Sequence, residues 1–142
     1  MATVATVLIL PIPPSDNHSH DLITRPSRHP DKLQLLRVPS SRTKAYYQEA
    51  GWLAKTWMLE TGWQVPPPDQ KLVLRYWVFW PDARRRDPGN LPKVLLDSLK
   101  GVLFSDDNIC MPQAMDFTVD RQHPRIEITL RRARPKRSPS NA

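Results

Sequence analysis

Residues 71–80 read KLVLRYWVFW and form the strongest strand signal in the chain. Side chains of a strand point alternately to its two faces, so Leu72 and Leu74 share one face and Trp77 lies on the other. Both faces are largely apolar, and aliphatic and aromatic residues are enriched in strands. We therefore predict that residues 71–80 form the central strand of a sheet.

Two helices are expected on either side of this strand. Apolar residues recur every three or four positions over residues 41–61, with Ser41 as the expected helix N-cap. A second, shorter helix is expected over residues 90–100. Asn90 is its N-cap candidate, and Gly101 suits the left-handed position that follows a helix.

Three further strands complete the expected fold, over residues 2–10, 115–120 and 125–132. Residues 15–40 are polar, contain several prolines and show no apolar periodicity, so they are expected to form a long loop. The resulting order is β–loop–α–β–α–β–β. It predicts a single small α+β domain in which a mixed β-sheet packs against two main helices.

The composition limits the function. The chain has 142 residues, 21 Lys+Arg against 14 Asp+Glu, and a net charge of +7, which favours a polyanionic partner such as nucleic acid. A single cysteine, Cys110, excludes an internal disulfide framework and a cysteine-based zinc cluster. The apolar run over residues 4–12 is about half the length of a membrane span and contains a proline, so no membrane segment or signal peptide is expected.

Much of the positive charge lies at the C-terminus. Residues 131–142 carry five positive and no negative side chains, and subtracting them from +7 leaves +2 for residues 1–130. We therefore expect a folded domain over residues 1–132, followed by a disordered basic tail over 133–142. Such a tail favours non-specific attraction to a nucleic-acid backbone.

The helix expected over residues 90–100 has a polar face. Asn90, Lys93 and Asp97 fall within one arc of it, at spacings of three and seven residues. The ordinary interpretation of such a face is that it is solvated. Two further hypotheses stay open: a non-catalytic nucleic-acid-binding module that uses the arginines at 84–86 and the tail, and an interaction protein whose tail binds an acidic partner.

The neighbouring carboxylates suggest more than a solvated face. Asp87 precedes the helix and Asp106 and Asp107 follow it, so four aspartates occur within 21 residues and converge if the chain doubles back. Clustered carboxylates repel unless a cation neutralises them, and oxygen ligands suit Mg²⁺. Arginines at 84–86 and the nearby lysine would hold phosphates.

The same segment carries a family resemblance. Residues 85–99, RRDPGNLPKVLLDSL, resemble the R-D-x-D-N-x-x-K-x-x-x-D-x-L signature of the RusA family of Holliday junction resolvases. Residues 101–107, GVLFSDD, resemble that family's G-v-l/i-x-D-D continuation. Residues 11–17, PIPPSDN, are similar to its strand-ending P-x-P-P-S-x-N.

The resemblance implies a RusA-like domain and a homodimeric endonuclease that resolves four-way DNA junctions by paired symmetric nicks in recombination and repair. Its cofactor would be Mg²⁺, or Mn²⁺ in its place, with no organic cofactor. The expected location is the cytoplasm of a bacterial or phage-infected cell. The implied catalytic residues are Asp87, Lys93 and Asp107. The metal ligands are Asp87 and Asp107, joined by Asp106. The supporting residues are Asn90, Asp97 and Asn17. The DNA contacts come from Arg84, Arg85, Arg86 and Lys93.

One position departs from the family pattern. Gly89 stands where the family usually has a second aspartate, two residues after Asp87. Pro88 and Gly89 suit the centre of a type II turn, in which the glycine takes a positive φ. Two outcomes stay open at this point: Asp106 or a water replaces the missing ligand, or the protein binds branched DNA without cutting it.

Overall fold

The computed structural model describes residues 6–15, 20–26 and 33–134. A four-stranded sheet has the order β1-β6-β4-β5. Its strands are β1 (Leu8–Leu10), β4 (Leu72–Trp80), β5 (Cys110–Val119) and β6 (Arg125–Arg132). β4 pairs parallel with β5 and antiparallel with β6, so the sheet is mixed and the α+β prediction is confirmed.

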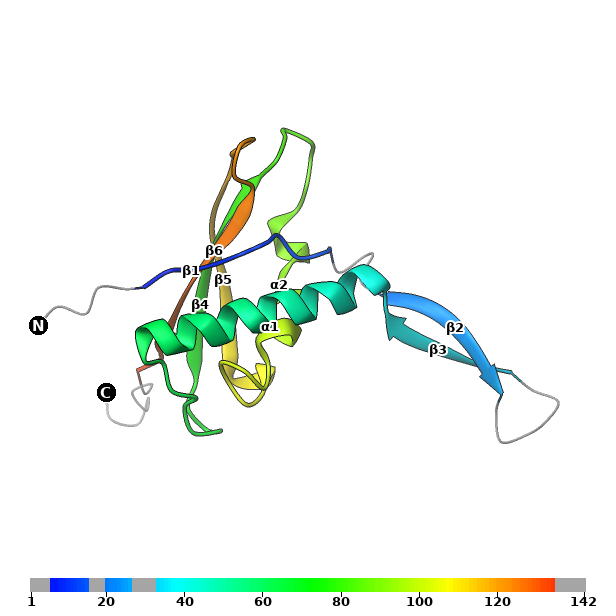
Figure 1. The fold of residues 1–142 in the computed structure, drawn as a ribbon, viewed down its shortest axis with the longest axis horizontal. Helices are drawn as coiled ribbons and strands as arrows, with labels where there is room; N and C mark the ends of the chain where they lie inside the picture. The colour runs from blue at the N-terminus through cyan, green and yellow to red at the C-terminus, as the bar shows by residue number, and fades with distance from the viewer. Residues whose placement is uncertain (1–5, 16–19, 27–32, 135–142) are drawn as a thin grey trace, which may run out of the picture.

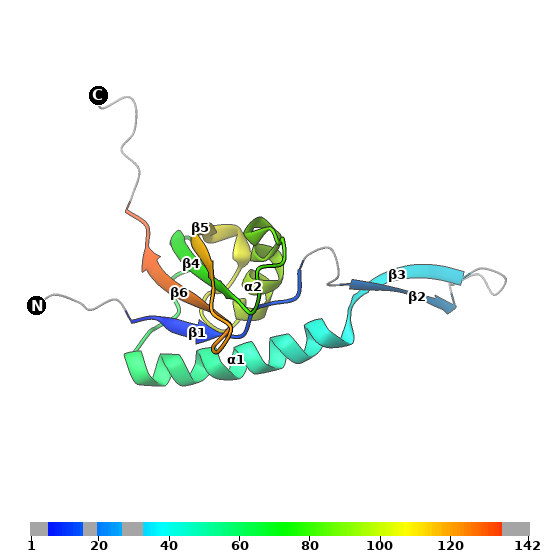
Figure 2. The same cartoon turned by 90° about the horizontal axis from the view of Figure 1, so that it is seen from above.

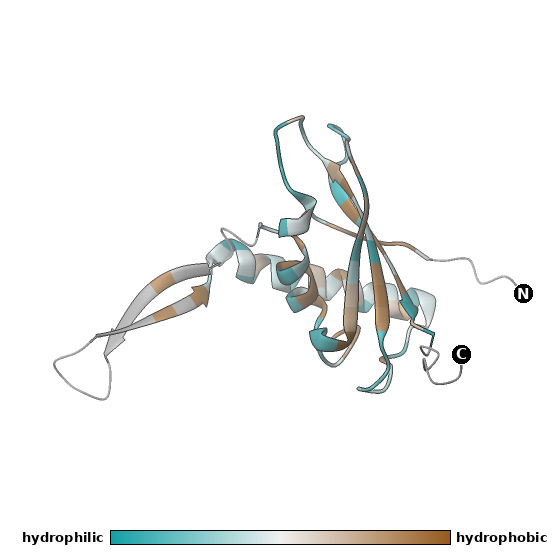
Figure 3. Ribbon diagram, turned by 180° about the vertical axis from the view of Figure 1, so that it is seen from behind, coloured by the Kyte–Doolittle hydropathy of each residue, from teal (hydrophilic) through white to brown (hydrophobic). Residues whose placement is uncertain are grey.

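Two helices cover one face of this sheet (Figures 1 and 2). They are α1 (Ser41–Thr61) and α2 (Pro92–Leu99). The even-numbered residues of β4 face them and are buried, as the alternation predicted. Figure 3 shows the resulting alternation of apolar and polar residues along the strands.

The ends of α1 differ slightly from the prediction. Ser40, not Ser41, is the N-cap, and its hydroxyl oxygen accepts a hydrogen bond from the Thr43 N–H at 3.2 Å. The prediction was one residue late because two consecutive serines offer the same capping group. Gly62 ends the helix with a φ of 73°, in the left-handed region that favours glycine.

The long loop predicted over residues 15–40 is wrong. Two strands, β2 (His20–Pro26) and β3 (Leu33–Pro39), pair antiparallel and extend away from the sheet at the start of α1 (Figures 1 and 2). Apolar alternation marks strands with one buried face, whereas this ribbon is held by pairing between its own two backbones. The expected supporting residue Asn17 lies outside the described residues.

The second helix is shorter than predicted. A 3₁₀ turn, η2 (Pro88–Asn90), comes first, and α2 follows it. Asn90 therefore lies inside η2 and is not an N-cap; Leu91 takes that position because Pro92 suits the first helical turn. Gly101 has a φ of 79°, which confirms its predicted left-handed conformation.

The C-terminal half contains a longer edge strand than expected. β5 begins at Cys110 rather than at residue 115, directly after the 3₁₀ turn η3 (Asp107–Ile109). At the same end of the sheet, Ala133 donates its N–H to the Lys71 carbonyl at 2.9 Å, so the first residue of the predicted tail is paired. Residues 135–142, where the disordered tail was predicted, lie outside the described residues.

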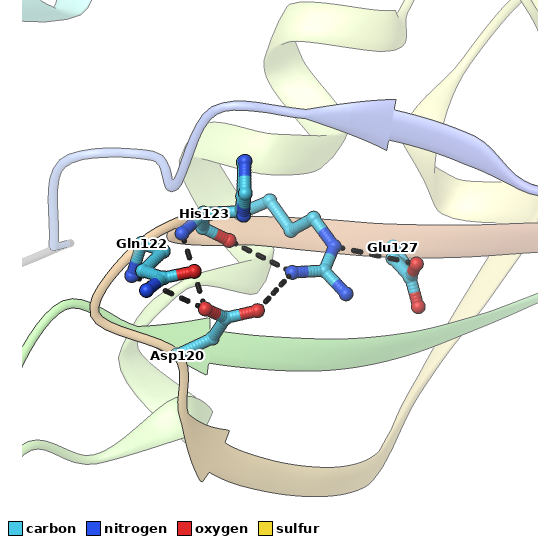
Figure 4. A network of polar contacts seen from close by, with 5 residues as sticks. Asp120, Gln122, His123 and Glu127 are labelled. Carbon is cyan, nitrogen blue, oxygen red and sulfur yellow. Dashed lines mark hydrogen bonds and ion pairs between the residues drawn. The ribbon is translucent and has the colours of Figure 1, made fainter.

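A network of polar contacts closes the turn between β5 and β6 (Figure 4). The Asp120 carboxylate accepts hydrogen bonds from Arg125 Nη1 at 2.8 Å and from the Gln122 and His123 N–H groups. The Arg125 guanidinium lies 3.8 Å from the centroid of the Phe79 ring. The hydrogen bond from Arg125 is the main reason that the pKa of Asp120 lies below its usual range.

We expect Asp120→Asn to lower the melting temperature by a few degrees at pH 7. Since the folded-state pKa of Asp120 is depressed, its contribution is present above the unfolded pKa of about 3.9 and is lost as the pH falls below it. Thermal unfolding from pH 7 to pH 3 measures this. Asp69→Asn, at an exposed carboxylate, is the control. A difference from the wild type that stays constant down to pH 3 would contradict the account.

Candidate active site

The loop between β4 and η2 is held by its own side chains. Arg86 Nη1 donates to Asp82 Oδ1 at 2.6 Å, and its guanidinium lies 5.1 Å from the Trp80 ring centroid. Hydrogen bonds from Arg86 and from the Arg84 N–H lower the pKa of Asp82 to about 2. The Arg86 side chain therefore stabilises the conformation of the loop, whereas the Arg84 and Arg85 side chains are exposed.

Asp87 stands where this loop enters η2. Its Oδ1 atom accepts a hydrogen bond from the Gly89 N–H at 2.8 Å and so caps the 3₁₀ turn. Within the described part of the chain, the other carboxylate oxygen, Oδ2, forms no hydrogen bond. The turn itself is fixed to the sheet because the Tyr76 hydroxyl donates to the Pro88 carbonyl at 3.0 Å. Asp87 thus presents a fixed, exposed carboxylate.

The conformation of Gly89 differs from the expected type II turn. Among the described glycines, only Gly62 and Gly101 have a positive φ, so Gly89 needs no special backbone freedom. The Asp87 carboxylate satisfies its N–H, and this favours the 3₁₀ turn over a type II turn. A Cβ atom added at position 89 would lie 3.1 Å from Asp87 Oδ1. A side chain there would therefore stand directly beside the Asp87 carboxylate.

The polar face of α2 is tied to α1. Lys93 Nζ lies 3.7 Å from Asp97 Oδ2, one turn further along the helix. Burial, and after it the interaction with the Asp97 carboxylate, raises the pKa of Tyr47 in α1. Lys93 is 61% exposed, so the contact with Asp97 directs an ammonium group that is otherwise free to reach a ligand.

Asp106 and Asp107 adjoin each other at the entry to β5. A hydrogen bond with the Asp107 side chain is the main cause of the lowered pKa of Asp106, and Lys100 Nζ lies 3.7 Å from Asp106 Oδ1. Burial and the negative charge of Asp107 raise the pKa of Cys110 to about 12. The ionised form of Asp106 is therefore the one that its neighbours stabilise.

The four aspartates do not form one cluster. Within the described ranges, no three His, Cys, Asp or Glu side chains are grouped so that they could hold a metal ion. Asp97 interacts with Tyr47 of α1, and Asp106 Oδ1 lies 3.7 Å from Lys100 Nζ. η2 nevertheless lies against β5, the strand that Asp107 leads into. The donor set still fits Mg²⁺, which takes one or two carboxylates and completes its shell with waters and phosphate oxygens.

A hollow of about 580 Å³ opens beside Asp87. Three segments form its walls: residues 12–15 after β1, the start of α1, and the loop that carries Arg84, Arg85 and Arg86. Asn90 of η2 also lines it. Arg42, in the first turn of α1, is a lining residue that the sequence did not indicate, because only the tertiary fold brings it to a loop some forty residues later.

The comparisons with known proteins agree with the resemblance seen in the sequence. Residues 24–131 match the family model described as Endodeoxyribonuclease RusA. A search of curated proteins finds no match. The matched range contains every candidate site residue from Arg84 to Asp107, whereas the proline-rich segment at 11–17 lies outside it. No helix in the described ranges is both long and apolar enough to cross a membrane.

Proposed function

The chain belongs to the RusA endodeoxyribonuclease family, and from this membership we propose that it resolves four-way DNA junctions by paired symmetric nicks, with a divalent cation as cofactor. The observation that carries the proposal is the family match over residues 24–131, which includes the carboxylates, the lysine and the arginine loop described above. The proposed setting is recombination and repair in the cytoplasm of a bacterial or phage-infected cell.

Asp87 and Asp107 are the proposed metal ligands, with Asp106 as a third. The support is chemical: Asp87 has a carboxylate oxygen that forms no hydrogen bond among the described residues, and Mg²⁺ takes carboxylate oxygens such as those of Asp106 and Asp107. Mg²⁺ or Mn²⁺ bound there supplies Lewis acidity, which polarises the phosphodiester and makes water more acidic. Asn90, next to this site, is proposed to orient the phosphate.

Lys93 is proposed to stabilise the negative charge that develops on the phosphate during cleavage. Its ammonium group is 61% exposed and lies 3.7 Å from Asp97 Oδ2. A positive charge fixed before the reaction stabilises the transition state without a reorganisation cost at that moment. Asp97 therefore acts through Lys93 and supports the site rather than touching DNA.

A homodimer is proposed because paired nicks in opposed strands need two sites related by a two-fold axis. β5 offers a surface for it. It is the edge strand of the sheet, and all of its residues after the first are exposed. Its large apolar side chains at the surface are Met111, Met115, Phe117 and Val119. A long edge with such residues favours pairing with another chain.

We expect Asp87→Asn and Asp107→Asn each to reduce nicking of a synthetic four-way junction at least about a hundredfold, because each removes a charge from the reacting centre. Junction binding in EDTA should stay within a few-fold of the wild type. Gel analysis of end-labelled strands in Mg²⁺ measures cleavage, and Asp69→Asn is the matched control. Wild-type binding without divalent-dependent nicks would contradict the enzymatic proposal.

Gly89→Asp is expected to increase nicking severalfold at limiting Mg²⁺. The φ of this residue suits any side chain, and after a shift of a few tenths of an ångström by the exposed Asp87 carboxylate, 3.1 Å from the added Cβ, the new carboxylate would stand beside it. Gly89→Ala is the control, since it adds the Cβ without the carboxylate. Nicking rates measured over a Mg²⁺ titration test the idea. Equal rates for both variants would mean that position 89 is not a ligand position here.

Phe117→Lys is expected to raise the dimer dissociation constant at least roughly tenfold, since a charge at an edge strand opposes pairing. Leu59→Lys in α1 is the control because Leu59 is even more exposed, at 87% against 57%, and lies away from the edge. Sedimentation velocity over a concentration series gives the dimer dissociation constant of each variant. A Phe117→Lys variant as dimeric as the control would exclude β5 as the interface.

A further inference from the structure

The hollow beside Asp87 has a charge pattern that the proposed cleavage chemistry does not use. We propose that it is a phosphate-binding subsite, anchored by Arg42 with Arg84 and Arg85, which holds the backbone phosphate adjacent to the one that is cut. This inference rests on the proposed function for its ligand, DNA, and it adds a residue from α1 to the DNA-binding surface.

The first support is the balance of charge around the hollow. Of the four arginines that line it, Arg86 is paired with Asp82 at 2.6 Å. Within the described ranges, Arg42, Arg84 and Arg85 form no ion pair, and Asp87 is the only carboxylate in the lining. Guanidinium groups that converge without a counter-charge repel one another, so an anion between them lowers the free energy of the site.

The second support is that the walls are fixed before any ligand binds. Tyr46 of α1 donates its hydroxyl to the Pro11 carbonyl at 2.8 Å, which holds the wall at 12–15 against the start of the helix. Thr43, next to Arg42, is fully buried and bonded to the Ser40 cap. The third wall is the loop held by Arg86. The backbone positions of the three arginines around the hollow are therefore set before a ligand binds.

The third support is the chemistry and size of the hollow. A guanidinium is a planar fork of donors that matches the oxygens of a phosphate, and arginine is favoured where phosphate is bound. A volume of about 580 Å³ is within the range of ligand sites and exceeds what a single ion needs. Because Asp87 lines the same hollow, a strand whose scissile phosphate lies at Asp87 would bring its next phosphate to Arg42.

The test measures junction affinity as a function of salt. The full chain binds a fluorescent four-way junction in EDTA, followed by anisotropy over a range of NaCl concentrations. Arg42→Gln is expected to weaken binding roughly five- to tenfold near 0.1 M salt and to reduce the salt slope by about 0.9, as for the loss of one phosphate contact. Lys55→Gln is the control. It removes an exposed charge from the same helix about 20 Å further along and should change neither value.

A second arm identifies the phosphate. In a junction that carries a neutral methylphosphonate next to the cleavage position, the wild type should lose the same affinity, and Arg42→Gln should lose nothing more, because the two changes remove one contact. Adding inorganic phosphate at matched ionic strength tests whether the hollow binds free phosphate rather than a phosphate of the DNA backbone. Competition that abolishes the difference between wild type and Arg42→Gln without displacing the DNA would assign the hollow to free phosphate and overturn the proposal.

The outcomes separate this inference from the proposed function. Normal junction cleavage together with an Arg42→Gln salt slope equal to that of Lys55→Gln overturns the subsite alone. A reduced slope in a protein that never nicks DNA in Mg²⁺ or Mn²⁺ supports the subsite and contradicts the enzymatic proposal. Thermal unfolding of each variant, which should match the wild type, shows that the exposed substitutions leave the fold intact.

Discussion

The hydrogen bond from the Tyr76 hydroxyl to the Pro88 carbonyl, 3.0 Å long, connects the site to the rest of the structure. Tyr76 is 2% exposed in the central strand, so its ring is fixed by the core on the helix side of the sheet. Its hydroxyl sets the position of η2. Asp87 directly precedes η2 and α2 follows it, so the position of η2 determines where both lie. A site built from exposed charges thereby takes its geometry from a buried strand.

The charged residues of the site fall into two groups, those that form ion pairs and those that form none among the described residues. Asp82 with Arg86, Lys93 with Asp97, and Lys100 with Asp106 each join groups that are close in sequence, and such partly exposed pairs contribute little stability in themselves. Their effect is positional, since they direct the loop, the lysine and the entry to β5. The arginines left without a partner among the described residues then surround the hollow, where an anionic ligand supplies the missing charge.

Much of the fold could be predicted because β4, β6 and α1 each bury at least one face. A buried face places apolar residues at a regular spacing in the sequence, which identifies the element. The ribbon of β2 and β3 was missed because its backbone pairing leaves no such period. Spacing alone indicated four aspartates within 21 residues, and the resemblance to the RusA signature selected Asp87, Lys93 and Asp107. Arg42 could not be predicted as a lining residue, because no local sequence pattern relates the start of a helix to a loop some forty residues later. Asn90 was misplaced because Asp87 caps a 3₁₀ turn ahead of the helix.

Two coordinated cuts at a four-way junction define the proposed activity, and they can be detected by cleavage of a supercoiled plasmid with an extruded cruciform. Two nicks placed within one binding event convert the plasmid to linear DNA, whereas independent nicks relax it to open circles and remove the cruciform. The account predicts linear product from the start of the reaction in Mg²⁺ or Mn²⁺ and none in EDTA. Open circles alone, or an uncut plasmid that the protein still binds, would contradict it.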